Sequence, residues 1–149
     1  MRRRPAPPAG ESLESVRAVY RDLSARPVVR QCELRTECCR FQLTGKTPHL
    51  TRGEALLAAK ALRASGRKSL PQRTDGACPL LAPGTSRCMI YAERPFGCRT
   101  HFCAAAGGPY ARREVIDLIR RLEDIDTQLG CDGPRALPGA VADALRALS

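Results

Sequence analysis

The chain has 149 residues, a formal net charge of +10 and 43% hydrophobic residues, of which 21 are Ala, while Trp is absent. Large apolar side chains are therefore scarce, and a core this thin would gain from a cross-link or a bound metal. No run approaches the roughly 18 apolar residues that a membrane span needs, and the amino terminus lacks the apolar segment of a secretion signal. We expect a cytoplasmic protein without membrane association, with a flexible tail over residues 1–10 and one domain over residues 11–149.

The first two predicted helices are bounded by clear signals. Residues 11–25 (ESLESVRAVYRDLSA) carry one apolar face, and Pro27 ends that helix. In the segment 49–66, Thr51 and Glu54 have the spacing of a capping box, and Gly66 can close the far end. The apolar face of the first helix consists of Leu13, Val16, Tyr20 and Leu23.

Two more helices are predicted in the carboxy-terminal part, one ending at Gly130 and a short one starting at about Pro138. Before them, CPLL (78–81) and RCMIY (87–91) flank a Pro-Gly-Thr-Ser turn typical of a small hairpin. The expected fold is mainly α: a small single domain of about four helices around an irregular, Cys-rich, metal-binding middle with a short β-hairpin. The third helix should bury a face made of Val115, Ile116, Ile119, Leu122, Ile125 and Leu129.

Cysteines are the main functional signal. Seven of the eight lie within residues 26–103, where eleven Arg and three Lys outnumber five acids. Cations beside thiols favour the thiolate that binds metal, and in a reducing cytosol clustered thiols bind metal more often than they form disulfides. Cys131 is expected to be an ordinary thiol. The candidate metal ligands are Cys32, Cys38, Cys39, Cys78, Cys88, Cys98 and Cys103.

The cysteine spacing, C-x5-C-C and then C-x9-C-x9-C-x4-C, is neither the paired C-x2-C of common zinc ribbons nor a C-x-x-C redox motif. Adjacent side chains of an extended chain point to opposite faces. Cys38 and Cys39 therefore divide between ligation and packing, serve two metals, or meet at one cluster through a turn. Thiolate quartets from loops suit zinc or an iron–sulfur cluster, and a surplus of irregularly spaced thiols favours the cluster.

These cysteine segments resemble the family named for its CxxCxxCC motif, the YkgJ-like zinc- or iron-chelating domains, which is related to a domain of flagellin lysine methylases. Leu50, Thr51 and Glu54 are similar to an L-T-x-x-E element that opens a helix between the two halves of the family pattern. The resemblance covers residues 32–103 and implies that the chain chelates iron or zinc. The second half of the pattern matches at Cys78, Pro79, Leu81, Cys88, Ile90, Tyr91, Arg94, Pro95, Cys98, Arg99 and Cys103.

One position departs from the family pattern, since Arg35 stands where CxxCxxCC has its second Cys. Seven matching thiols remain, enough for one site of four ligands, whereas two full sites would need His101 or another donor. Arg94 and Arg99 are expected to bind the cofactor by donating hydrogen bonds to thiolates or cluster sulfides.

No active site is predicted, because the sequence lacks a Gly-rich phosphate loop, a Ser–His–Asp grouping and a carboxylate pair with a His partner. Tyr91 is expected to be a packed aromatic rather than a catalytic acid, and Glu93 a surface residue. Two alternatives to metal chelation stay open. One is a thiol-redox or metal-responsive sensor, with Arg35 and Arg99 favouring thiolates. The other is a basic nucleic-acid-binding module with a structural metal, which the scarcity of aromatic side chains for base stacking disfavours.

Overall fold

The computed structural model describes residues 9–26, 47–71, 77–82, 88–100, 111–131 and 133–148. The described part is mainly helical, which confirms the predicted fold class, and a two-stranded antiparallel sheet joins β1 to β2. No helix in these ranges is long and apolar enough to cross a membrane. The elements are α1 (Ala9–Ser24), β1 (His49–Leu50), α3 (Arg52–Ala64), η2 (Tyr91–Glu93), α4 (Phe96–Thr100), α5 (Arg112–Gln128), β2 (Arg135–Ala136) and α6 (Leu137–Ala147).

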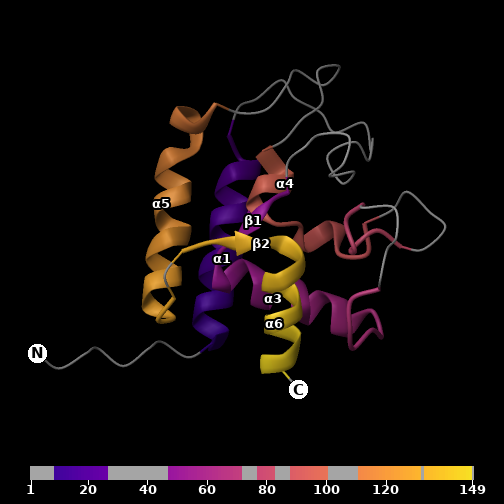
Figure 1. Ribbon diagram of the computed structural model, residues 1–149. Coiled ribbons are helices and arrows are strands. Elements are labelled where there is room, and N and C mark those ends of the chain that lie inside the picture. Colours follow the sequence, from indigo (N-terminus) through magenta and orange to yellow (C-terminus); the bar gives the residue numbers. More distant parts are fainter. Residues whose placement is uncertain are drawn as a thin grey trace, which may run out of the picture.

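The central helix is α3, which runs between α1 and α6, while α5 packs on the other side of α1 (Figure 1). Seven of the thirteen residues of α3 are buried. Ala58 and Ala59 face a cluster shared with Val141 and Ala144 of α6, and small side chains let the two helices approach closely. Leu57 instead belongs to a second cluster with α1 and α5. The two halves of the thin core therefore meet at α3.

The predicted first and second helices are confirmed. All four residues of the predicted α1 face are buried, although α1 starts at Ala9, two residues earlier than expected. Pro27 lies outside the described residues. Gly66 ends α3 with a φ of 96°. Its N–H donates to the Arg63 carbonyl at 2.9 Å, and the Arg67 N–H donates to the Leu62 carbonyl at 3.2 Å, which is the Schellman arrangement expected of a glycine at this place.

The predicted apolar face of α5 is partly wrong. Leu118 is buried and Ile116 only half-buried, while the other predicted positions are buried or pack against the second cluster. At 100° per residue, Leu118 lies within 60° of Val115 on the side facing α1, whereas Ile116 turns 100° away from it. Asp126 is also buried, at 2% exposure. Gly130 ends the helix as predicted, with a φ of 78°.

The predicted hairpin is present as a single antiparallel bridge between Leu81 and Cys88, reinforced by a 2.8 Å hydrogen bond from the Met89 N–H to the Leu80 carbonyl. The last helix, α6, carries Pro138 in its first turn, as expected. The β1–β2 sheet, η2 and α4 were not predicted. Each strand of the sheet has two residues, too few for a recognisable alternation.

Gly53 marks a close approach of α3 to α1 and α5. A Cβ at this position would lie 2.8 Å from Cγ2 of Val16 and 3.2 Å from Cγ2 of Ile125, and Val16 is fully buried. We expect Gly53→Ala to lower the free energy of unfolding by about 1–3 kcal/mol, since overpacking outweighs the better helix propensity of Ala.

Gly139→Ala in α6 is the matched control for this substitution. Nothing lies within 4 Å of a Cβ added there, so we expect a free energy of unfolding that is unchanged or higher by up to about 1 kcal/mol. Urea unfolding of both variants measures the difference. Equal losses in the two variants would contradict a close helix contact at Gly53.

Candidate metal centre

The structure describes four of the eight cysteines, and none of these four forms a disulfide. Three of them are predicted ligands, and the fourth, Cys131, follows the glycine that ends α5. Its N–H donates to the Asp126 carbonyl at 3.0 Å, so its backbone closes that helix. The remaining predicted donors, Cys32, Cys38, Cys39, His101 and Cys103, lie outside the described residues, as does Arg35.

Cys78 and Cys88 stand on the hairpin that packs against α3 and α6. Cys78 is 4% exposed, and its carbonyl accepts the Leu81 N–H at 3.1 Å in the turn that starts the hairpin. Leu81 is in turn the bridge partner of Cys88. The side chains of Leu80 and Ile90 are buried in the first cluster. The backbone next to both thiols is therefore held in place by the core.

Cys98 stands on a different support, the five-residue helix α4. Pro95 directly precedes α4, is fully buried, and accepts the Cys98 N–H at 3.0 Å. Phe96, the first residue of α4, is 6% exposed and packs in the second cluster with α1 and α5. The R-P-F-G-C-R sequence therefore forms a turn and a short helix whose proline and phenylalanine enter the core.

A buried carboxylate, Glu54, links α4 to the rest of the molecule. Its Oε1 accepts the Phe96 N–H at 2.7 Å and the Tyr20 hydroxyl at 3.2 Å. Its Oε2 accepts the N–H and the hydroxyl of Thr51 at 3.0 and 3.2 Å. Burial raises the pKa of Glu54, and the four donors act against this shift. The capping-box spacing predicted the Thr51 contact, but the contacts with α1 and α4 have no local sequence signal.

A second buried carboxylate, Asp126 of α5, also holds the start of α3. Its Oδ1 accepts the Arg52 N–H and its Oδ2 accepts the Gly133 N–H, each at 2.8 Å. Asp126 therefore satisfies one of the N–H groups that the first turn of a helix leaves without an intrahelical partner. It also ties α3 to the connection between α5 and β2. An acidic residue on an apolar stripe is the only hint of this role in the sequence.

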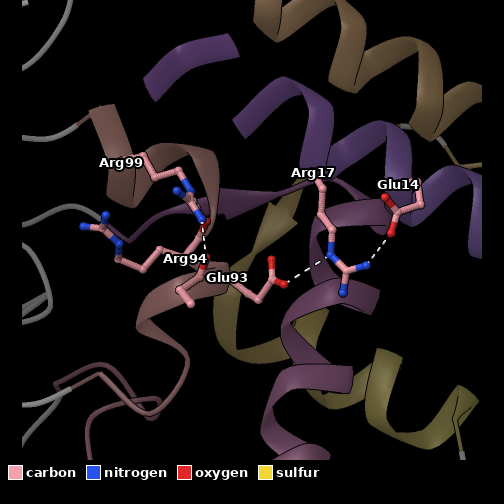
Figure 2. A network of polar contacts seen from close by, with 6 residues as sticks. Glu14, Arg17, Glu93, Arg94 and Arg99 are labelled. Atoms are coloured by element: carbon pink, nitrogen blue, oxygen red, sulfur yellow. Dashed lines mark hydrogen bonds and ion pairs between the residues drawn. The ribbon is translucent and has the colours of Figure 1, made fainter. Parts of the chain in front are cut away.

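Of the two arginines predicted to bind a cofactor, Arg99 lies in α4 and Arg94 lies two residues before that helix. Figure 2 shows both side chains. The Arg99 guanidinium stacks on the Tyr20 ring at 4.2 Å from the centroid, and donates to the carbonyls of Arg94 at 2.7 Å and Ala92 at 2.8 Å. Burial lowers the pKa of Arg99. Arg94 stacks over the Tyr91 ring at 4.0 Å and donates through Nε to the Tyr91 carbonyl at 3.0 Å.

The expectation that Tyr91 packs in the core is wrong. Its side chain is 43% exposed, and it carries the Arg94 guanidinium on its ring. In the C-M-I-Y sequence the neighbouring Ile90 takes the buried position instead, at 3% exposure. Because η2 begins at Tyr91, the alternation of the hairpin ends there and no longer determines which side chain faces the core.

Glu93, which was expected to be a surface residue, forms an ion pair with another element. It is bound by Arg17 of α1 at 3.2 Å, and Arg17 contacts Glu14 at 2.5 Å (Figure 2). The hydrogen bond with Glu14 is the main reason that the pKa of Arg17 is raised. The segment that carries Cys98 is thus attached to α1 both through this ion pair and through the stack of Arg99 on Tyr20.

The possible metal-binding side chains around Cys78, Cys88 and Cys98 are mainly thiols. Within the described ranges, no group of three or more His, Cys, Asp or Glu is placed to hold a metal ion, so Cys78, Cys88 and Cys98 do not form a trio by themselves. A site of four thiolates has to include cysteines outside these ranges. Glu93 is the only acid between Cys78 and Cys98 in the sequence, and it pairs with Arg17. Thiolates without carboxylates are typical ligands of zinc and iron–sulfur centres.

Comparison with known families identifies the class of protein. Residues 30–122 match the family model CxxCxxCC, described as "Putative zinc- or iron-chelating domain". The match spans more than half of the chain, which therefore belongs to this family. The matched range includes all seven candidate ligands and leaves out Cys131. No curated protein and no solved structure matches the chain.

The raised pKa of Glu54 has a consequence for stability. The folded protein holds this proton more tightly than the unfolded chain, in which the ordinary value is 4.5. The stability gained is present below 4.5 and is lost as the pH rises through the raised pKa. Between about pH 4 and pH 7, we expect the free energy of unfolding of the wild type, relative to Glu54→Gln, to fall with rising pH. Urea unfolding of both proteins across this pH range measures the difference. A wild type that becomes more stable relative to Glu54→Gln as the pH rises would mean that the four donors lower the pKa of Glu54 by more than burial raises it.

Proposed function

We propose that this chain binds iron, as an iron–sulfur cluster, or zinc through four thiolates, with the cluster favoured over zinc. The family match carries this proposal, because it spans every cysteine of the two dense motifs and excludes the isolated one. In the described parts of residues 77–100 the only acid is Glu93, which is paired with Arg17, so thiolates are the main candidate donors there. The four ligands would be drawn from Cys32, Cys38, Cys39, Cys78, Cys88, Cys98 and Cys103.

The supports of the described thiols agree with such a site. A metal ligand has to be held in place by the chain around it. Cys78 and Cys88 are held by the cluster of α3 and α6, and Cys98 by the cluster of α1 and α5. A metal that combined thiolates from both supports would cross-link the two halves of a thin core. When bound, a cluster would supply electron transfer or metal sensing, and zinc would supply a structural link.

Arg94 is the better candidate of the two arginines for contact with the metal centre. Arg99 uses Nε and one terminal nitrogen on backbone carbonyls and lays its plane on Tyr20. Within the described residues, Arg94 donates a hydrogen bond only through Nε. In Figure 2 its guanidinium extends away from Arg17 and Glu14. The terminal N–H groups of Arg94 can therefore donate to thiolates or sulfides, while Arg99 mainly fixes α4.

Metal analysis of protein purified without oxygen tests the proposal, with Cys98→Ser and Cys131→Ser compared with the wild type. We expect the wild type to contain iron and acid-labile sulfide and to absorb visible light. Cys98→Ser should lose most of the metal, because a serine hydroxyl is a poor ligand for either ion at neutral pH. Cys131→Ser lies outside the family match and should keep it.

The outcomes separate the two metals. Colourless wild-type protein with one zinc per chain would decide for zinc over the cluster. Wild-type protein that holds neither metal, whether prepared with or without oxygen and supplied with both, would overturn the proposed function. Metal retained at the wild-type level in Cys98→Ser would remove Cys98 from the ligand set.

A further inference from the structure

We infer that Glu54 is the positioning residue for Cys98: its buried carboxylate, at the start of α3, fixes the short helix that carries this thiol. The inference deepens the proposed function and rests on it in so far as Cys98 is a ligand. Glu54 touches no cysteine among its four hydrogen-bond contacts. Its effect on Cys98 is therefore exerted through the backbone of α4.

Glu54 contacts α4 directly through Phe96. Its N–H donates to Oε1 of Glu54 at 2.7 Å, the shortest of the four contacts, and Cys98 follows two residues later. A helix of five residues has little stability of its own, so contacts from outside determine how α4 is oriented. Glu54 supplies such a contact from a helix 42 residues away in the sequence.

Glu54 also acts on α4 through Tyr20. Its hydroxyl donates to Glu54, and its ring carries the guanidinium of Arg99, the residue directly after Cys98. Cys98 therefore lies between Phe96 and Arg99, which both depend on the same carboxylate.

The two backbone contacts of Glu54 require a carboxylate at this position. Each oxygen of Glu54 accepts one backbone N–H, from Phe96 at Oε1 and from Thr51 at Oε2. A hydroxyl can rotate and accept instead, but a backbone N–H can only donate. In Glu54→Gln, one of these two N–H groups must face the side-chain NH2. The variant keeps the size of the residue and loses either the hold on α4 or the cap of α3.

Asp126→Asn is the matched control. Asp126 is 2% exposed and Glu54 3%, and each accepts two backbone N–H groups. Asn at this position must also turn its NH2 toward one of them. Both substitutions weaken the start of α3, but the second partner of Asp126 is Gly133, in the connection between α5 and β2, rather than α4. A general loss of stability would appear in both variants, and a loss of Cys98 positioning only in Glu54→Gln.

The experiment measures the alkylation rate of Cys98 in the folded protein as purified, relative to that of Cys78 in the same molecule. Global unfolding exposes both thiols, so a change in their ratio that occurs in Glu54→Gln but not in Asp126→Asn reports on α4. We expect Glu54→Gln to raise the ratio about tenfold, as loss of a buried hydrogen bond allows, and Asp126→Asn to leave it within about twofold. A competition assay with a chelator should show zinc binding weakened about tenfold in Glu54→Gln only.

An unchanged ratio in Glu54→Gln, or an equal rise in both variants, would overturn the inference. If Glu54→Gln does not fold, Tyr20→Phe replaces it. That variant removes one donor to Oε1, and its ratio should rise by roughly twofold to fivefold; no rise would count against the inference. A wild type that binds no metal defeats the proposed function, yet the alkylation ratio still decides whether Glu54 positions α4.

Discussion

The hydrogen bonds of the buried Glu54 carboxylate determine how the segment that carries Cys98 is placed against α1 and α3. A carboxylate out of water is costly unless donors surround it, and each donor lost leaves part of that cost uncompensated. Four donors surround this one, from Tyr20 in α1, from Thr51 before α3 and from Phe96 in α4. Because moving any of these donors away would leave the buried carboxylate without a partner, the carboxylate stabilises one relative placement of α1, the start of α3 and α4.

This network joins two segments of the chain that are far apart in the sequence. Thr51 and Glu54 belong to the L-T-R-G-E segment, and the Phe96 N–H that donates to this glutamate belongs to R-P-F-G-C-R. The stack of Arg99 on Tyr20 adds a contact between the second segment and α1. The residues around Cys98 are therefore used mainly to hold α4. This use of Arg99 also weakens the sensor hypothesis, because its guanidinium is committed to two carbonyls and an aromatic ring.

Local patterns predicted the parts of the fold that local physics decides. The periodicity of α1, the glycine ends of α3 and α5, and the start of α6 all follow from the backbone and from the nearest neighbours in sequence. Sequence patterns gave the wrong buried residue where tertiary contacts decide between two apolar neighbours. Leu118 is buried rather than Ile116, and Ile90 rather than Tyr91. Patterns also could not show that Glu54 reaches α1 and α4, since those partners are 34 and 42 residues away. The candidate ligands were chosen by residue type, while the supports of Cys78, Cys88 and Cys98 could be seen only in the structure.

In the thin core, the candidate ligand Cys78 also contributes to the packing. Alanines at the contact of α3 and α6 let the helices approach closely but bury little apolar surface. Cys78, at 4% exposure, lies within that cluster beside the hairpin leucines. A thiol in such surroundings contributes to packing as a small apolar group, and a bound metal would keep it shielded from water and oxidants. Packing and metal binding therefore favour the same position for Cys78, so burial of this thiol agrees with the proposed ligand role.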